Sequence, residues 1–312
     1  MSQLAEIIRR PLLVQAPEPV MALVEDLKER FGDALSGVLF YGSCLRQGDA
    51  LDGVVDLYVL VSNYAEAYPA WRSRMLARVL PPTVGYLELS YQDRVLRTKY
   101  AVLSLDDFRR GTSRRWFHSY LWGRFAQPCV LAYARDENTT AMVEGCLQQA
   151  AETLLDRTML AGPSRVNATE LWGRALELSY SAEMRPESSG RAAAIVAANE
   201  HYYRAVTREL APLLRALRPI EADEDSYRIL STRWRAMRTR VAWSCRRVWG
   251  KLLSVARWLK ALTTFEGGLD YAAWKLERHS GVKVQISDRM RRRPWLYVWG
   301  ELIRLYRSGA LR

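Results

Sequence analysis

Residues 37–61, GVLFYGSCLRQGDALDGVVDLYVLV, decide the fold. Their two apolar runs, at 37–41 and 54–61, have the length and the β-branched and aromatic content of buried strands. The polar, glycine-containing stretch between the runs predicts a turn. The first strand therefore ends at Tyr41-Gly42-Ser43, and Asp56 lies inside the second strand.

The segments around this stretch alternate between helix and strand. Residues 18–31 predict an amphipathic helix with Pro19 near its first turn, and residues 65–79 predict another helix. Residues 84–91 and 99–104 predict two further strands. Alternation of this kind, with few turn-rich hairpins, indicates an α/β domain with a mixed sheet.

From residue 137 onward the pattern is almost wholly helical, with breaks at 162–163, 186–190 and 219–225. The last break is the strongest boundary. We therefore predict an α/β domain at 1–160, a helical segment at 161–225 and a basic, Trp-rich helical region at 226–312.

Composition excludes several classes of protein. The chain has 312 residues, 49% of them hydrophobic and 26% charged, which is typical of a globular protein and not of a disordered one. No uncharged apolar run approaches the length needed to cross a bilayer, and the first residues lack the apolar core of a secretory signal. The four Cys and three His are scattered, so neither a zinc site nor a Ser-His-Asp hydrolase is predicted. We expect a soluble or peripheral protein of the cytoplasm.

The positive charge gathers at the end of the chain. Residues 228–312 contain 20 Lys and Arg against 5 Asp and Glu, a net charge of +15, and seven of the eleven Trp. The rest of the chain has a net charge of −3. Basic residues interleaved with aromatic ones suit anionic phosphates, in nucleic acid or in lipid headgroups. Composition alone does not choose between the two.

A long helix is predicted within this basic region. Apolar residues recur there at spacings of three and four, and the Lys and Arg residues fall off this apolar stripe. The stripe consists of Trp234, Met237, Val241, Cys245, Val248, Leu252, Val255, Leu259 and Leu262. One hypothesis is that the stripe packs on the core and the basic face is solvated. The other is that the helix meets a membrane surface.

The turn after the first strand has the residues of a phosphate site. Gly42 would let the backbone approach a triphosphate, and Ser43 and nearby amides would donate to its oxygens. Asp56 on the neighbouring strand would bind a bridging Mg²⁺. This is how nucleotidyltransferases of the DNA polymerase β type are built. Their usual second carboxylate is replaced here by Tyr58, and an ordinary turn beside an edge Asp is the simpler interpretation.

The chain also resembles a narrower family, the mitochondrial-type phosphatidate cytidylyltransferases. These are the CDP-diacylglycerol synthases of the mitochondrial translocator assembly and maintenance family, and the resemblance covers roughly residues 20–210. The family has the same Tyr-Gly-Ser turn, followed by a strand with one Asp. Three more blocks match in order: KYAVLS at 99–104, YLWGRFAQPCV at 120–130 and LSYSAEMR at 178–185. The family's glycine after the serine is Cys44 here, and its Asp in the last block is Glu183.

The resemblance implies Mg²⁺-dependent transfer of a cytidylyl group from CTP to phosphatidic acid. It implies a polymerase-β-like fold, a place on the inner face of the cell membrane and no nucleic-acid partner. Asp56, Glu183 and Lys99 are the candidate catalytic residues, with Asp56 and Glu183 as metal ligands and Glu88 as a rival carboxylate. The candidate nucleotide-binding residues are Tyr41, Gly42, Ser43, Lys99, Arg124 and Arg185.

Residues 226–312 would dock on anionic lipid, with 289–293 and the adjoining 294–297 as the main contact. Two alternatives remain open. One is a nucleotidyltransferase acting on RNA, or an inactive nucleic-acid-binding relative. The other is an inactive lipid-binding scaffold, suggested by Tyr58 and Cys44.

Overall fold

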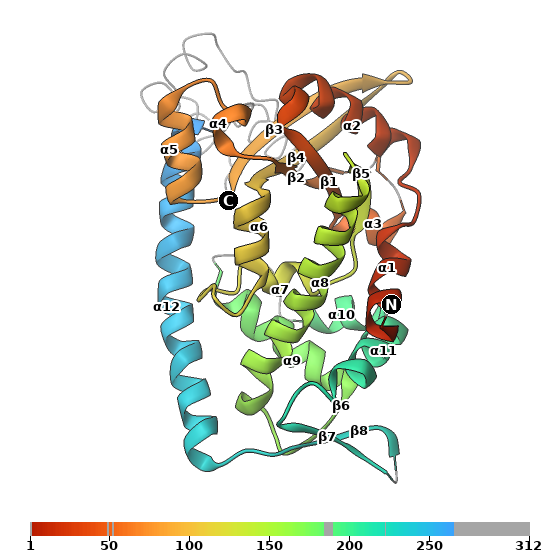
Figure 1. Cartoon of the computed structure of the whole chain (residues 1–312), viewed down its shortest axis with the longest axis vertical. Helices are drawn as coiled ribbons and strands as arrows, with labels where there is room; N and C mark the ends of the chain where they lie inside the picture. Colours follow the sequence, from red (N-terminus) through yellow and green to blue (C-terminus); the bar gives the residue numbers. More distant parts are fainter. Residues whose placement is uncertain (1, 49, 52, 184–189, 222, 265–312) are drawn as a thin grey trace, which may run out of the picture.

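The computed structural model describes residues 2–48, 50–51, 53–183, 190–221 and 223–264. A five-stranded mixed sheet organises the first half of the chain, in the strand order β3-β4-β2-β1-β5 (Figure 1). β2 and β4 are parallel and the other neighbours are antiparallel. The strands are β1 (Leu35–Tyr41), β2 (Val55–Val61), β3 (Thr83–Tyr91), β4 (Arg94–Ser104) and β5 (Val130–Ala134). The predicted mixed α/β fold is confirmed.

The four strands predicted from sequence are all present, and two of them form an unpredicted hairpin. β3 and β4 pair in an antiparallel ladder that closes at Gln92 and Asp93. Both residues have positive φ, 46° and 60°, in a turn that contains neither Gly nor Pro. Turn signals based on Gly and Pro therefore missed it.

Helices cover the sheet on both faces and build the second half of the chain. The predicted helix at 18–31 is confirmed as α2, whereas the predicted helix at 65–79 is two helices separated by Pro69. The residue before a proline is pushed out of the helical region, and Tyr68 is extended. The first six helices are α1 (Gln3–Leu12), α2 (Glu18–Phe31), α3 (Ser43–Gln47), α4 (Tyr64–Ala67), α5 (Trp71–Val79) and α6 (Leu105–Thr112). The others are α7 (Trp122–Phe125), α8 (Glu137–Thr158), α9 (Ala168–Ser181), α10 (Arg191–Ala197), α11 (Glu200–Leu210) and α12 (Arg233–Thr264).

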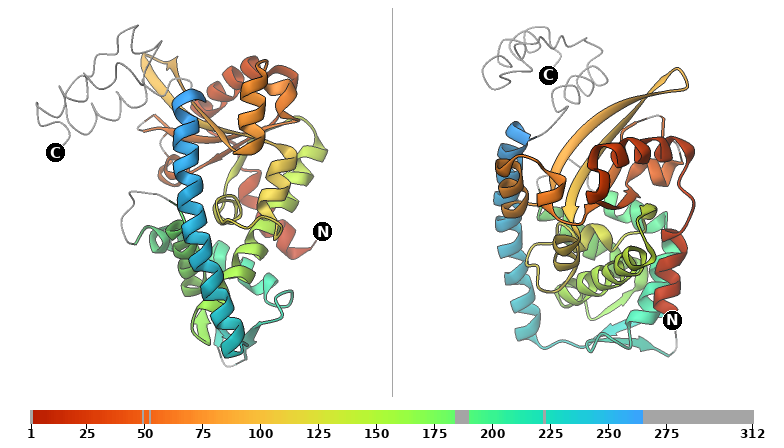
Figure 2. Two further views of the ribbon diagram at one scale, coloured as in Figure 1. Left: turned by 90° about the vertical axis from the view of Figure 1, so that its left-hand side faces the viewer. Right: turned by 45° about the horizontal axis from the view of Figure 1, so that its top comes forward.

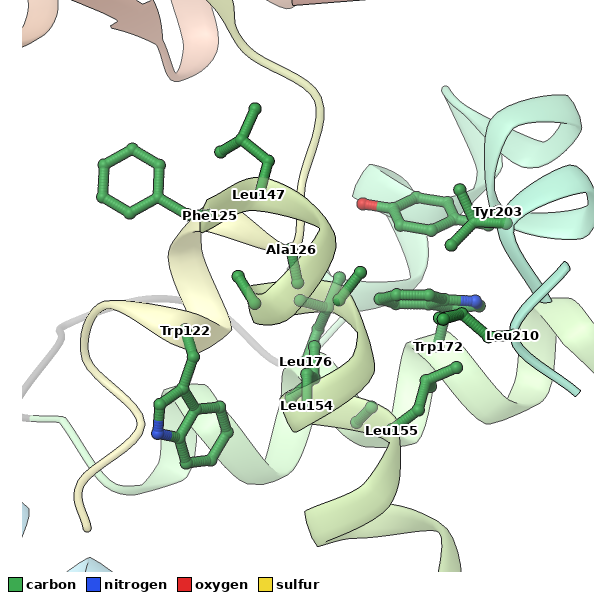
Figure 3. Packing of buried hydrophobic residues seen from close by; sticks show 14 of the residues in the cluster. Trp122, Phe125, Ala126, Leu147, Leu154, Leu155, Trp172, Leu176, Tyr203 and Leu210 are labelled. Carbon is green, nitrogen blue, oxygen red and sulfur yellow. The ribbon is translucent and has the colours of Figure 1, made fainter. Parts of the chain in front are cut away.

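The two faces of the sheet belong to two hydrophobic cores. α2 packs on the face that carries Phe40 and Leu57. The opposite face, with Tyr58 among its residues, joins a larger core formed with α1, α6, α7, α8, α9 and α11. Figure 3 shows part of this larger core, where Trp172 lies beside Tyr203 with ring centroids 4.8 Å apart. The larger core fixes the sheet against the helical half of the molecule.

A small second sheet lies in the helical half. β6 (Arg165–Asn167), β7 (Leu217–Ile220) and β8 (Asp223–Ile229) form an antiparallel sheet in the order β6-β8-β7. The expectation of an almost wholly helical second half is therefore wrong in this part, and the predicted break at 219–225 is a β-hairpin. These strands are short and largely polar, so they lack the apolar alternation that identifies a strand. The domain boundaries at 160 and 225 stay predictions.

The predicted long helix is confirmed as α12, which runs along one side of the molecule from the small sheet to β3 (Figures 1 and 2). The first of the two hypotheses, that the stripe packs on the core, is wrong. The apolar stripe faces away from the protein, and its described large hydrophobic side chains are between 45% and 63% exposed. We call Trp234, Met237, Val241, Cys245, Val248, Leu252, Val255 and Leu259 the outer face of α12. The side chain of Leu262 lies outside the described residues.

The inner face of α12, defined as Trp243, Arg246, Gly250, Arg257 and Lys260, packs on the protein. Arg246 Nε donates to the carbonyl oxygen of Phe117 at 2.8 Å. A Cβ on Gly250 would meet the carbonyl oxygen of Ala182. The inner face therefore meets exposed backbone groups, which suit polar side chains better than a leucine stripe. Among the described helices, none combines the length and the apolar character needed to cross a bilayer.

Candidate active site

Three residues predicted for the site lie in one row across the sheet. The strand registers pair Tyr41 with Asp56, and Asp56 with Lys99. Residues paired in this way project from the same face of a sheet. The row lies at the last residue of β1 and the second residue of β2. The sequence placed these residues together, and the structure does the same.

Gly42 is required where it stands. Its φ is +95°, a region that L side chains rarely adopt, and a Cβ there would lie 2.6 Å from Asp56 Oδ2. The turn is thus pressed against the Asp56 carboxylate. Ser43, which follows, is the first residue of α3 and is partly buried. The Gly-Ser turn and the carboxylate therefore form one unit.

Asp56 lies in a field of positive charge. Burial raises the pKa of its carboxyl group, and the cations Lys99, Arg124, Arg191 and Arg46, in that order of effect, act to lower that pKa. No hydrogen bond or ion pair from any described residue engages the carboxylate itself. A partly buried carboxylate that is compensated by cations, without a hydrogen bond from a described residue, remains available to a ligand. The sequence motifs did not identify Arg46 or Arg191. Arg46 lies in the predicted turn after the first strand but at no position of the motif, and Arg191 follows the last matched block at 178–185.

Arg124 is held in a cage of tyrosine rings. Its Nη1 donates to the Tyr41 hydroxyl at 3.1 Å, and its Nη2 lies 3.3 Å from Glu183 Oε2. The guanidinium carbon lies 4.7 Å from the ring centroid of Tyr120 and 5.9 Å from that of Tyr58. Its Nε is buried, and no described residue gives it a hydrogen-bond partner. Arg124 therefore joins the predicted phosphate site to the predicted acid, Glu183.

Both predicted metal ligands interact electrostatically with Arg124. The positive charge of Arg124 acts to lower the pKa of Asp56, and Glu183 forms an ion pair with Arg124. Among the described residues there is no group of three or more His, Cys, Asp or Glu that could enclose a metal ion. A Mg²⁺ at this position would take one or two of these carboxylates and fill its other positions with substrate phosphates and water. The Asp56 carboxylate against Gly42 is the better placed of the two acids.

One further candidate, Glu88, stands apart from this group. Glu88 accepts a hydrogen bond from Tyr86 at 2.7 Å and is ion-paired with Arg97 at 3.1 Å. Its strand, β3, is separated from the Asp56 strand by β4, which is two interstrand spacings of about 4.8 Å. Glu88 is thus engaged away from the turn. Arg185 lies outside the described residues.

α12 brings one more cation to the site. The Arg257 guanidinium carbon lies 4.2 Å from the ring centroid of Tyr120, the same ring that Arg124 contacts. Arg257 Nε donates to the carbonyl oxygen of Pro81 at 3.1 Å. Arg257 also lines a small cavity together with Glu183 and His118. Nothing in the sequence distinguishes Arg257 from the other basic residues of α12, because only the contact with Tyr120 sets it apart.

No protein-family model and no curated protein matches the chain. Among solved structures, the chain is similar to a nucleotidyltransferase-like protein from Exiguobacterium sibiricum. The similarity covers 64% of this chain and 80% of the other, with 10% sequence identity and a TM-score of 0.28. We draw no conclusion about the site from a likeness of this degree.

Proposed function

We propose that this chain is a Mg²⁺-dependent nucleotidyltransferase that transfers a cytidylyl group from CTP to phosphatidic acid. The products would be CDP-diacylglycerol and pyrophosphate. The observation that supports the proposal best is the Asp56 carboxylate, pressed against Gly42 and surrounded by cations. A carboxylate with several cations around it suits a polyphosphate that arrives with a divalent metal.

In the proposed reaction, an oxygen of the phosphatidate phosphomonoester attacks the α-phosphorus of CTP. The bond from that phosphorus to the oxygen bridging to the β-phosphorus breaks, and pyrophosphate leaves. The attacking oxygen is already ionised near neutral pH, so the site needs no strong general base. His118 is unsuited to that role, since burial lowers its pKa to about 3 and its Nδ1 accepts a hydrogen bond from Trp116.

The residues of the site would bind the phosphates, hold the metal ion and orient one another. Backbone amides after Gly42 and the hydroxyl of Ser43 would donate to phosphate oxygens, while Lys99 would act as a point charge on the triphosphate. Asp56, with Glu183 as the second candidate, would hold a Mg²⁺, which would neutralise negative charge on the phosphates. Arg124 is paired with Glu183, so we assign it the orientation of Tyr41 and Glu183 first and phosphate contact second.

We further propose that the outer face of α12 docks the enzyme on an anionic membrane, where phosphatidic acid resides. α12 contains nine Lys and Arg and no Asp or Glu, and its outer face exposes large apolar side chains. Each basic residue near an anionic surface contributes about 1 kcal/mol to binding. The predicted contact at 289–297 lies outside the described residues and stays a prediction.

A nucleotidyltransferase acting on RNA is the second candidate, favoured by the basic residues of α12. Phosphates of RNA would satisfy these cations equally well. Binding to RNA does not explain, however, why valine, leucine and methionine side chains are exposed between these basic residues. The apolar outer face therefore favours the lipid substrate.

The deciding experiment incubates the pure protein with α-labelled CTP, Mg²⁺ and vesicles containing phosphatidic acid. We expect labelled lipid, its loss on chelation with EDTA, and its loss in Asp56→Asn. The matched control is Asp106→Asn, since the Asp106 side chain is 84% exposed at the start of α6. Transfer of label to an RNA acceptor, with none to lipid, would replace this proposal with the second candidate.

A further inference from the structure

A second helix exposes an apolar stripe flanked by arginines. On α5, Trp71, Met75 and Val79 are 64%, 56% and 76% exposed. They recur every four residues and therefore share one side of the helix. The helix also contains three Arg and no acidic residue, and it packs inward through the buried Ala77. This composition repeats that of the outer face of α12 in a segment about 160 residues earlier.

α5 and α12 lie side by side. Lys260 Nζ on α12 donates to the carbonyl oxygen of Leu80 at 2.9 Å, at the C-terminal end of α5. Val79 precedes Leu80 and Leu259 precedes Lys260, so the exposed ends of the two stripes adjoin this hydrogen bond. Figures 1 and 2 agree that α5 lies beside the end of α12 that is nearest the five-stranded sheet. Two helices distant in sequence thus expose apolar side chains in one neighbourhood.

We propose that α5 and the outer face of α12 form one continuous docking surface for an anionic lipid bilayer. The inference deepens the proposed function and rests on its membrane-bound substrate. Apolar side chains would enter the boundary between headgroups and acyl chains, while the arginines would remain at the level of the phosphates. A protein that docks through two helices is fixed in orientation as well as in depth.

The charges of the two helices favour an anionic bilayer over three other occupants. A second copy of the chain would place one basic, acid-free helix against another. Residues 265–312 of the same chain also contain more basic than acidic residues. RNA would match the arginines but would leave Met75, Val79 and their neighbours in water. Only an anionic bilayer satisfies both the charge and the apolar area.

Docking can be tested with a fluorophore attached to an exposed cysteine that the chain already contains. Cys245, on the outer face of α12, is exposed, whereas Cys44, Cys129 and Cys146 are buried. An environment-sensitive fluorophore on Cys245 reports docking of α12. Met75→Cys in a Cys245→Ser background reports docking of α5, and Leu213→Cys in the same background is the control, because Leu213 is 60% exposed beyond the end of α11.

With vesicles of phosphatidylcholine and phosphatidylglycerol, we expect blue shifts at Cys245 and at Met75→Cys, and none at Leu213→Cys. Both shifts should weaken with salt and be absent with pure phosphatidylcholine. A shift at Cys245 alone would overturn the inference and leave the docking of α12 intact. Shifts with single-stranded RNA, or shifts that depend on protein concentration without lipid, would replace the bilayer with another occupant. No shift at either position would reject docking altogether.

A second measurement separates docking from folding and from catalysis. The triple variant Trp71→Ser, Met75→Ser, Val79→Ser should bind anionic vesicles about tenfold more weakly or worse, since interfacial binding scales with buried apolar area. Its unfolding temperature should match that of the parent, because the three side chains are exposed. The matched control is Leu13→Ser, Val14→Ser, Leu213→Ser, which removes side chains that are also exposed. Equal vesicle binding by the two triple variants would reject the inference. Because no nucleotide is present, the result does not depend on the proposed reaction.

Discussion

The end of the five-stranded sheet and the inner face of α12 both bury charged side chains, but they treat the charges differently. Lys260 on α12 is surrounded by oxygens: its Nζ donates to the carbonyls of Leu80 and Pro82 and to Thr83 Oγ1. Asp56 on β2 receives no hydrogen bond from any described residue and is compensated only by cations around it. The first arrangement is typical of a structural charge, because hydrogen bonds occupy the buried group. The second leaves a charge available to a ligand.

The difference suggests a way to separate structural residues from functional ones in this chain. Removing a side chain of the first kind, together with its hydrogen bonds, should destabilise the fold. Removing a charge of the second kind should abolish activity and leave the fold as stable as before, or more stable. Each of the following predictions tests one side of that contrast.

Asp56→Asn should show the largest effect on function. The amide keeps the size of the side chain but loses the charge that a metal-bound triphosphate requires, so we expect the turnover rate to fall by about two to four powers of ten. Burial raises the pKa of the Asp56 carboxyl group in the folded protein. The folded state therefore holds a proton more tightly than the unfolded state, and ionisation of Asp56 at neutral pH lowers the free energy of unfolding.

The unfolding temperature of Asp56→Asn should accordingly equal or exceed that of the parent at pH 7. Thermal unfolding and labelled-CTP turnover, measured on one preparation, check both parts. A variant that is inactive because it is less stable would assign Asp56 a structural role.

Trp243→Ala should show the largest effect on stability. The Trp243 side chain is fully buried, its Nε1 donates to the carbonyl oxygen of Arg157 at 2.8 Å, and its ring packs edge-on to Trp122. Removing a buried Trp costs about 3–5 kcal/mol of stability. Trp249→Ala is the matched control, since Trp249 lies on the same helix and is 50% exposed. Urea unfolding of the two variants should differ by most of that amount, and equal midpoints would contradict the packing of α12.

Lys260→Met should have a smaller effect that depends on pH. Burial, aided by the charge of Arg257, lowers the pKa of Lys260 to about 7, from its ordinary value of 10.5. Between these two values the unfolded chain holds a proton that the folded protein has released, so the free energy of unfolding rises with pH across that window. Below about pH 7 both states are protonated and this dependence disappears.

Met removes the donor that serves three buried oxygens, and we expect a loss of about 1–3 kcal/mol. The loss should be greater at pH 9 than at pH 6, and the rise in stability between these values should be weaker in the variant. Urea unfolding at the two pH values measures both. An identical pH profile in parent and variant would show that Lys260 does not titrate there.

Prediction from the sequence succeeded where a residue pattern is typical of a single local structure. Apolar runs of strand length predicted β1 to β4, and the Gly-Ser turn with the downstream Asp predicted that Tyr41 and Asp56 lie on neighbouring strands. It failed to identify which face of α12 packs on the protein. A second stripe runs along that helix on its inner face, and apart from Trp243 it is carried by Arg, Gly and Lys, which a sequence pattern assigns to solvent.

The sequence also did not predict the contacts between segments that lie far apart in the chain. The approach of Arg257 to Tyr120 joins residues 137 positions apart, and the pairing of Arg124 with Glu183 joins two residues that the sequence assigned separate roles. Periodicity and motifs describe local structure, whereas these contacts arise when α7, α9 and α12 pack together. The β7–β8 hairpin escaped for a local reason, since its strands are largely polar.

Polar substitution of the outer face of α12 should have the smallest effect on stability and still change binding. Val248→Ser with Leu252→Ser replaces two side chains that are 63% and 57% exposed, so the free energy of unfolding should change by less than about 0.5 kcal/mol for each. Cosedimentation with anionic vesicles should weaken, because interfacial affinity depends on the apolar area that enters the headgroup region. Turnover of soluble CTP with a short-chain, monomeric phosphatidate should stay at the parent level, since the substitutions leave Arg257 and Tyr120 in place. If the double variant instead unfolds several kcal/mol more easily, the stripe packs on protein after all, and the assignment of inner and outer faces would have to be exchanged.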